Sequence, residues 1–189
     1  MGGESSYAVL FPGQGSQAVG MAGELARAFP QARRALELAE QAVPGLVELM
    51  QKGPEDELRR TSNAQPALLA AGLACWWVWQ ELCRRPPAAL AGHSLGEYTA
   101  LAAAQALAAE DALRAVRLRG ELMEQAMEPG KGGMAAVMGL QDEDVVQLCQ
   151  QACQNLGEPA AVVAANFNAP GQVVVSGTSQ GLQEVQSLV

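Results

Sequence analysis

The sequence has 189 residues, of which 49% are hydrophobic, so it is long enough to bury one sizeable core. Twelve Lys and Arg against 20 Asp and Glu give a formal net charge of −8, which argues against nucleic acid because its binding requires a basic surface. An acidic partner protein would need a local basic patch. Two clusters are available, Arg84 with Arg85 and Arg114 with Arg117 and Arg119, although a solvated helix face or a helix C-cap explains each of them at least as well.

The first predicted strand covers residues 7–10 and leads into a glycine-rich loop, residues 11–17. Glycines on both sides of Gln14 allow its backbone N–H to approach another group closely. A helix is expected from about residue 16 to 28. Helical periodicity then continues to residue 82, with breaks at Pro30, at residues 44–45 and at residues 53–54.

Within that helical part, residues 67–79 form a continuous apolar run. The run is shorter than the roughly 20 residues that span a bilayer. It therefore predicts a buried helix, with Trp76, Trp77 and Trp79 around it, and no contact with a membrane.

The most informative pattern is at residues 92–96, where Gly-His-Ser-Leu-Gly fits G-x-S-x-G, the nucleophile elbow. A short apolar strand, residues 88–91, precedes it, and an Ala- and Leu-rich helix from residue 97 to 109 follows. A sharp turn there would expose the hydroxyl of Ser94, and the amide of Leu95 would point from a helix N-terminus to where an oxyanion forms. The alternative is an ordinary serine in a glycine-rich turn.

The pattern changes after a helix expected from residue 110 to about 127 and a glycine-rich linker at 129–133. A strand at 134–139, a helix at 141–155, strands at 161–165 and 172–176, and a last helix capped by Thr178 or Ser179 are predicted. This βαββα order lacks one strand of the ferredoxin-like βαββαβ unit.

Six segments in this order resemble malonyl-CoA:acyl carrier protein transacylases, the acyltransferases of fatty acid synthesis. They are FPGQGSQAVGM (11–21), GPEDELRRTSNAQPAL (53–68), GHSLGEYTAL (92–101), RLRGELMEQAM (117–127), GGMAAVMGL (132–140) and NFNAPGQVVVSG (166–177). The resemblance implies an α/β fold: an α/β-hydrolase-like core, incomplete in residues 1–129, with an inserted ferredoxin-like small subdomain, incomplete in residues 130–189. Acyltransferase domains of polyketide synthases carry similar motifs and remain an alternative.

The resemblance also implies roles for particular residues. Ser94 takes the malonyl group from coenzyme A and passes it to the phosphopantetheine thiol of acyl carrier protein. The backbone amides of Gln14 and Leu95 form the oxyanion hole. Arg119, in an R-G-x-x-M stretch, holds the malonyl carboxylate with a bidentate guanidinium, and Met123 lines the same pocket. Malonyl and methylmalonyl are not distinguished.

The residues singled out so far do not include a general base for Ser94. His93 is the only histidine, and neighbouring side chains diverge on a sharp turn, so we expect it to be a packed structural residue. The resemblance places the catalytic histidine beyond position 189, so the chain reads as an N-terminal portion of the enzyme. Asn166 or Asn168, at a strand end in the small subdomain, either faces the cleft or forms a turn.

Two other functions remain open, an α/β serine hydrolase and a non-catalytic scaffold, although a hydrolase does not need Arg119 to hold a carboxylate. No tightly bound cofactor is expected, because malonyl-CoA acts as a substrate. No metal is expected either, since a single histidine is available to complete a site with Cys149 and Cys153. The four cysteines lack a disulfide spacing, and the first residues fit a short disordered start better than a signal peptide or the myristoylation pattern that they match. These features favour a cytoplasmic protein, monomeric when full length.

Overall fold

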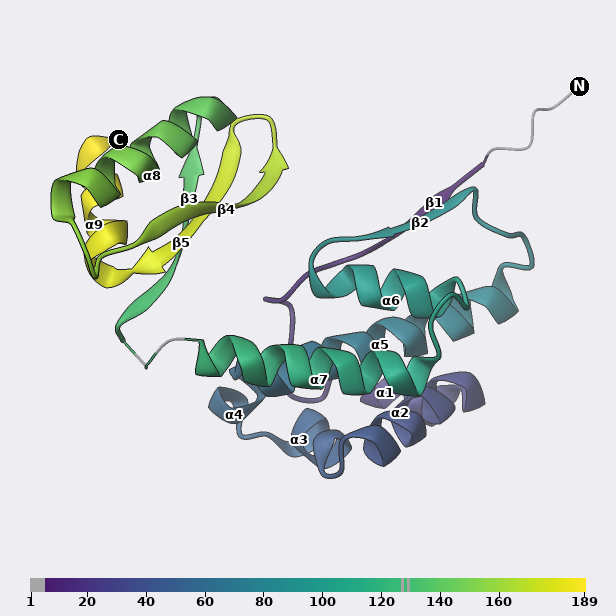
Figure 1. Ribbon diagram of the computed structural model, residues 1–189. Coiled ribbons are helices and arrows are strands. Elements are labelled where there is room, and N and C mark those ends of the chain that lie inside the picture. The colour runs from purple at the N-terminus through teal and green to yellow at the C-terminus, as the bar shows by residue number, and fades with distance from the viewer. Residues whose placement is uncertain (1–5, 127, 129) are drawn as a thin grey trace, which may run out of the picture. The chain divides into compact units, whose positions relative to one another are not determined.

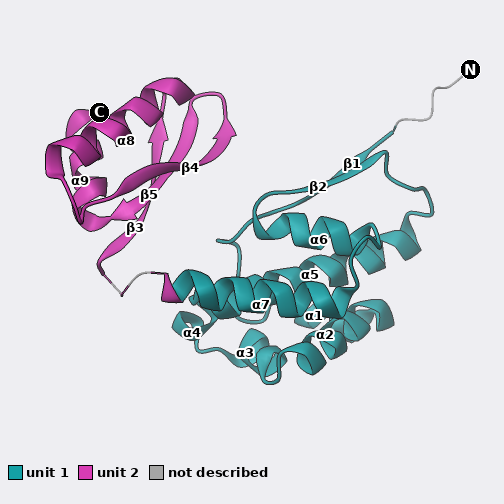
Figure 2. Cartoon of the chain, viewed as in Figure 1, with its two compact units in different colours: residues 1–124 teal, residues 125–189 magenta. Residues whose placement is uncertain are grey.

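The computed structural model describes residues 6–126, 128 and 130–189. The chain divides into two compact units, residues 1–124 and 125–189 (Figure 2). The boundary lies slightly before the glycine-rich stretch at which the sequence predicts a linker. The N-terminal myristoylation-like pattern, Met127 and Pro129 fall wholly or partly outside the described residues. One unit contains a parallel sheet and the other an antiparallel sheet, so the fold is mixed α/β.

The sheet of the first unit has two parallel strands, β1 (Ala8–Phe11) and β2 (Ala89–Gly92), in a register that pairs the last residue of one with the last residue of the other. Because parallel strands end at the same edge, the loop after β1 and the elbow after β2 leave the sheet side by side (Figure 1). The two predicted strands are confirmed, each shifted by one residue.

Seven described helices complete this unit: α1 (Gly23–Ala28), α2 (Pro30–Ala42), α3 (Leu46–Lys52), α4 (Glu55–Arg59), α5 (Thr61–Leu82), α6 (Leu95–Ala103) and α7 (Ala109–Gln125). The breaks predicted at prolines and glycines are confirmed. Pro30 begins α2, where its missing N–H costs nothing, and Gly45 precedes α3 with φ 83°. A further break at Arg60, between α4 and α5, was not predicted.

Two predicted helices are wrong in extent. Residues 16–22 are not helical, because Gly20 (φ 89°) and Ala22 (φ 59°) have left-handed backbones that interrupt the helical hydrogen bonds. The helix predicted to run to residue 109 ends at Ala103, and Gln105 is again left-handed with φ 59°. Local composition favours a helix in both places, but the left-handed residues turn the chain and end the helical hydrogen bonding there.

Helix α5 forms the centre of the first unit. Its residues Leu69 and Leu73 are fully buried, and Trp76 packs edge-on against Phe11 of β1 with ring centroids 6.5 Å apart. The Trp76 Nε1–H donates to the carbonyl of Ala103, at 3.2 Å. Among the described residues, no helix is long and apolar enough to cross a membrane.

The second unit contains β3 (Gly132–Met138), α8 (Asp142–Leu156), β4 (Val162–Ala169), β5 (Gln172–Thr178) and α9 (Ser179–Leu188). The strands form an antiparallel sheet in the order β3-β5-β4, packed on the two helices through a valine-rich core. The predicted βαββα order is confirmed. Thr178 is the N-cap of α9, since its Oγ1 accepts from the N–H of Gly181 at 3.1 Å. The linker prediction is wrong for Gly132 and Gly133, which pair with β5.

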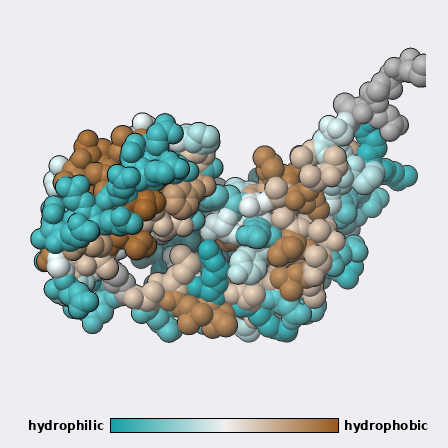
Figure 3. Space-filling view, turned by 45° about the horizontal axis from the view of Figure 1, so that its top comes forward, coloured by the Kyte–Doolittle hydropathy of each residue, from teal (hydrophilic) through white to brown (hydrophobic). Residues whose placement is uncertain are grey.

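Apolar side chains also reach the surface, as the brown patches among hydrophilic residues in Figure 3 show. On the first unit, Leu10 of β1 is 75% exposed. It borders an apolar groove of about 570 Å³ between β1 and α5, lined also by Trp76 and Trp79. Within the described part of the chain, β2 is the only strand paired with β1.

Candidate active site

Ser94 lies at the turn between β2 and α6, as the elbow motif predicts. Its backbone has φ 54° and ψ −113°, a conformation that costs free energy in a residue with a Cβ. The surrounding hydrogen bonds hold it there: the N–H of Gly96 donates to the carbonyl of His93 at 2.8 Å, and the N–H of His93 donates to the carbonyl of Phe11 at 3.1 Å. The half-buried Ser94 side chain is thereby held at the end of the parallel sheet.

The glycines of the motif allow the close approach of three backbone segments. A Cβ added to Gly92 would lie 2.0 Å from the carbonyl carbon of Gly96. A Cβ added to Gly96 would lie 2.2 Å from the carbonyl oxygen of Phe11. Any side chain at either position would therefore push the start of α6 away from the sheet and displace Ser94.

Arg119, from the middle of α7, points at the serine. Its Nη2 donates to Ser94 Oγ at 3.0 Å, and its Nη1 donates to Gln65 Oε1 at 2.7 Å. Gln65 is fully buried in α5, and its Nε2 in turn contacts the Sδ of Met123 at 3.3 Å. The buried amide thus orients a guanidinium fork over the hydroxyl, and a fork of this kind can bind an anion.

Gln65 was missed as an individual site residue. It belongs to one of the segments that carry the family resemblance, and it is a polar residue just before a long apolar run. A polar side chain at the edge of a buried apolar helix is the sequence feature that could have identified Gln65. Met123, which was expected to line the pocket, touches Gln65 and is 44% exposed.

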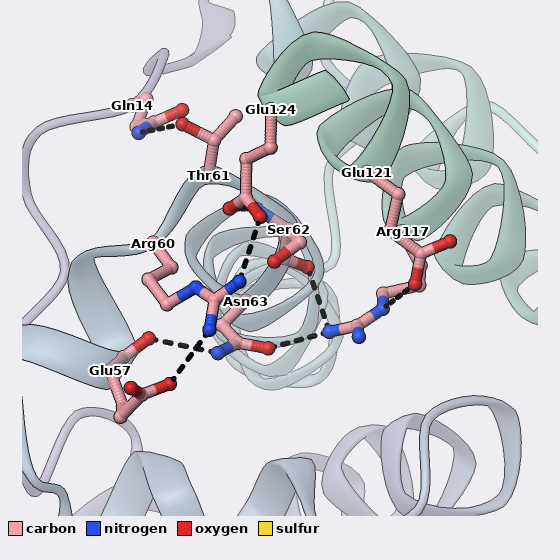
Figure 4. A network of polar contacts seen from close by, with 9 residues as sticks. All are labelled: Gln14, Glu57, Arg60, Thr61, Ser62, Asn63, Arg117, Glu121 and Glu124. Carbon is pink, nitrogen blue, oxygen red and sulfur yellow. Dashed lines mark hydrogen bonds and ion pairs between the residues drawn. The ribbon is translucent and has the colours of Figure 1, made fainter. Parts of the chain in front are cut away.

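The loop after β1 also reaches the elbow. A Cβ on Gly13 would lie 2.8 Å from Nδ1 of His93, so the loop backbone packs directly against this ring. The next residue, Gln14, donates from its side-chain Nε2 to Thr61 Oγ1 at 3.3 Å (Figure 4). Leu95 is the first residue of α6, so its N–H belongs to the group of helix N–H donors without a partner in their own helix.

The other sequence candidates lie in the second unit or elsewhere on α7. Asn166 and Asn168 both lie inside β4, which continues past the predicted strand end to Ala169 through two irregularities in its pairing. In the basic cluster of α7, Arg114 pairs with Asp111 at 3.4 Å, and Arg117 pairs with Glu121 at 2.6 Å. The described residues contain no cluster of three or more His, Cys, Asp and Glu side chains that could bind a metal ion.

A serine in a strained strand-to-helix turn, followed by helix N–H donors and facing an oriented cation, is the arrangement typical of a nucleophile elbow, here on a mixed α/β fold. Comparison with known proteins gives the family. The model of the acyl transferase domain matches residues 9–189, and the chain belongs to this family.

Its curated relatives include the malonyl CoA-acyl carrier protein transacylases of Salmonella typhimurium, 42% identical over 180 residues, and of Haemophilus influenzae, 44% identical over 184 residues. These alignments cover 95% and 96% of this chain but 57% and 58% of the relatives. The chain therefore spans less than two thirds of the length of the proteins that it matches.

Solved structures agree. The malonyl-CoA:acyl carrier protein transacylase from Xanthomonas oryzae is 47% identical with a TM-score of 0.88, over 98% of this chain and 58% of that one. A malonyl-transacylase in complex with its type II polyketide synthase acyl-carrier protein is 42% identical with a TM-score of 0.86, over 97% of this chain and 58% of that one.

Proposed function

We propose that the protein carrying this chain moves a malonyl group from coenzyme A to the phosphopantetheine thiol of acyl carrier protein, through a malonyl ester on Ser94. The hydrogen bond between Arg119 and Ser94 supports this proposal most directly. Malonyl differs from acetyl by a free carboxylate, and a guanidinium beside the nucleophile is suited to bind that carboxylate.

In the proposed first step, Ser94 Oγ attacks the thioester carbonyl and loses its proton to a general base. The tetrahedral oxyanion is stabilised by the N–H groups of Gln14 and Leu95, and the thiol of coenzyme A leaves with a proton. In the second step the phosphopantetheine thiol attacks the serine ester and regenerates the hydroxyl. When malonyl-CoA binds, Arg119 exchanges its hydrogen bond to Ser94 for one to the malonyl carboxylate. It keeps this bond and its bond to Gln65 through both steps.

The base is proposed to come from residues outside these 189. His93 is their only histidine; the residue is exposed rather than packed as expected, and its ring contacts the backbone of Gly13 on one side. This position suits a residue that holds the glycine-rich loop against the elbow.

The finer fold assignment is part of the same proposal. The parallel strands with a nucleophile elbow are the elements expected of an α/β-hydrolase-like core in residues 1–129. The βαββα order and antiparallel sheet of the second unit fit a ferredoxin-like subdomain in residues 130–189 that lacks its last strand.

Acyl carrier protein is the proposed partner, since one similar structure is a transacylase bound to its carrier protein. That carrier belongs to a type II polyketide synthase, which keeps a polyketide-synthase role as the second candidate. A serine hydrolase is disfavoured, because it would release the acyl group to water and would have no use for a carboxylate-binding arginine.

The proposal is tested by incubating the full-length protein with malonyl-CoA and analysing it by intact-protein and peptide mass spectrometry. We expect a malonyl adduct on the peptide containing Ser94, its disappearance on addition of phosphopantetheinylated acyl carrier protein, and no adduct on a Ser94→Ala variant. An adduct that persists in Ser94→Ala contradicts the proposed nucleophile. Release of free malonate without loading of the carrier identifies a hydrolase.

A further inference from the structure

The start of helix α5 is capped by a residue from another helix. Arg60, the residue before α5, makes no capping hydrogen bond with its side chain. Instead the backbone N–H of Ser62 donates to Oε1 of Glu124, from α7, at 2.8 Å (Figure 4). The carboxylate thus satisfies one of the N–H groups that a helix start leaves without an internal partner.

The second oxygen of Glu124 is also engaged. Its Oε2 accepts from Arg60 Nη2 at 3.2 Å, and Arg60 Nη1 lies 3.4 Å from Glu57 Oε2. Partial burial acts to raise the pKa of Glu124, but the hydrogen bonds from Ser62 and the ion pair with Arg60 outweigh it and leave the pKa below its ordinary value. The carboxylate is therefore ionised at neutral pH and binds both donors as an anion.

Two more residues on the same face of α7 contact the first turn of α5. Arg117 Nη1 donates to the carbonyl of Ser62 at 3.2 Å. A Cβ added to Gly120 would lie 2.6 Å from Ser62 Cα and 2.6 Å from the carbonyl oxygen of Thr61, so the two backbones touch. Spacings of three and four residues place Arg117, Gly120 and Glu124 on one side of the helix, where they hold the α5 start between them.

The first two turns of α5 carry two contacts to the proposed catalytic machinery. Thr61 accepts the side chain of Gln14, whose backbone N–H is assigned to the oxyanion hole. One turn later, Gln65 accepts from Arg119, which reaches Ser94. A shift of the α5 start relative to α7 would therefore displace the glycine-rich loop and the guanidinium together.

We propose that Glu124 is a positioning residue of the acyl-transfer site, which sets Arg119 and the Gln14 loop relative to Ser94 by capping α5 from α7. The inference rests on the function proposed above. In this role Glu124 does not touch the substrate. Glu124 acts through Ser62, Thr61 and Gln65.

The test compares Glu124→Ala, Glu124→Asp and Glu124→Gln in the full-length protein, with steady-state transfer from malonyl-CoA and acetyl-CoA. Alanine removes the cap, and aspartate keeps the charge on a side chain one methylene shorter. Glutamine keeps an oxygen acceptor for Ser62. The matched control is Glu55→Ala, which breaks an exposed ion pair of 2.6 Å with Arg59 on the neighbouring helix α4.

We expect Glu124→Ala to lower the ratio of malonyl to acetyl kcat/KM by about tenfold, with a raised KM for malonyl-CoA, because a displaced Arg119 grips the carboxylate poorly. Glu124→Asp should change the ratio in the same direction, Glu124→Gln should restore most of it, and Glu55→Ala should leave it unchanged. If Glu124 acts through Thr61, combining Glu124→Ala with Thr61→Val should cost less than the sum of the two single effects.

A merely structural role for Glu124 predicts something different. It would lower transfer of both acyl groups equally, in proportion to the folded fraction measured by thermal denaturation, and leave both KM values unchanged; that result overturns the inference. Should Glu124→Ala fail to fold, Glu124→Asp decides between these outcomes. Two further outcomes separate this inference from the proposed function. If the wild-type protein forms malonyl-Ser94 but every Glu124 variant keeps the wild-type selectivity, this inference alone is wrong. If the wild-type protein forms no such adduct, the proposed function is wrong and this inference with it.

Discussion

Arg119 Nη2 lies 3.0 Å from Ser94 Oγ, although the two residues are 25 positions apart and Arg119 belongs to α7 while Ser94 lies in the turn before α6. The hydroxyl accepts this hydrogen bond, so its own O–H is left to donate to another group. A cation in this place also raises the concentration of anionic acyl groups at the nucleophile. The proposed nucleophile and the residue proposed to select malonyl are therefore in direct contact in the absence of substrate.

Replacing Arg119 should change substrate choice more than turnover in general. We expect Arg119→Ala to cost malonyl transfer about 2–4 kcal/mol in transition-state stabilisation, as for a lost charge-assisted pair, while acetyl transfer holds or rises. Arg119→Lys should recover little, since a lysine cannot bind Gln65 and a carboxylate with a planar fork. The measurement is kcat/KM with both thioesters, and equal losses for the two acyl groups would refute the carboxylate role.

The elbow should not tolerate a methyl group on its second glycine. In Gly96→Ala the new Cβ meets the backbone oxygen of Phe11, which cannot rotate away, so overpacking should cost at least about 1–3 kcal/mol of stability and remove Ser94 acylation. Gly133→Ala is the matched control, because a Cβ there makes an ordinary 3.6 Å contact with Leu182. Urea denaturation and the malonyl adduct are measured for both; a stable, acylated Gly96→Ala would show that the elbow can relax.

The identity of the general base can be examined with a polypeptide of these 189 residues. We expect it to turn over malonyl-CoA about 10⁶-fold more slowly than the full-length protein, since a serine enzyme that loses its catalytic histidine loses rate on this scale. His93→Gln should change that residual rate little. Fast turnover that disappears in His93→Gln would instead make His93 the base.

Acid should weaken the contact between α7 and α5. The folded pKa of Glu124 is lowered, so this carboxylate contributes stability above its unfolded pKa of about 4.3, and the contribution is lost as pH falls through the folded value. Arg60, which faces it, stays charged over this range. The Tm difference between wild type and Glu124→Gln should therefore shrink from about pH 6 to about pH 3. A difference that is constant with pH would mean that the charge of Glu124 does not contribute.

Short-range patterns predicted the elements around the site. A strand, two glycines that each lie two positions from Ser94, and a helix identify an elbow because only that combination permits so tight a turn. Proline and glycine located the starts of α2, α3 and α4. Composition failed at residues 16–22 and after Ala103, where left-handed residues end a helix that the local sequence would have continued.

The sequence by itself thus determined the order of strands and helices and the position of Ser94 between a strand and a helix, and its family resemblance implied the α/β class and the candidate role of Arg119. Tertiary structure decided how Arg119 is held. Gln65 lies 54 positions away from it, and Glu124 caps the start of a helix 62 positions earlier in the chain because α5 and α7 pack together. Local periodicity says which face of a helix is apolar, but not which backbone N–H a carboxylate 62 positions away will meet. That pairing depends on how closely two helices approach, and here the missing side chain of Gly120 sets the distance.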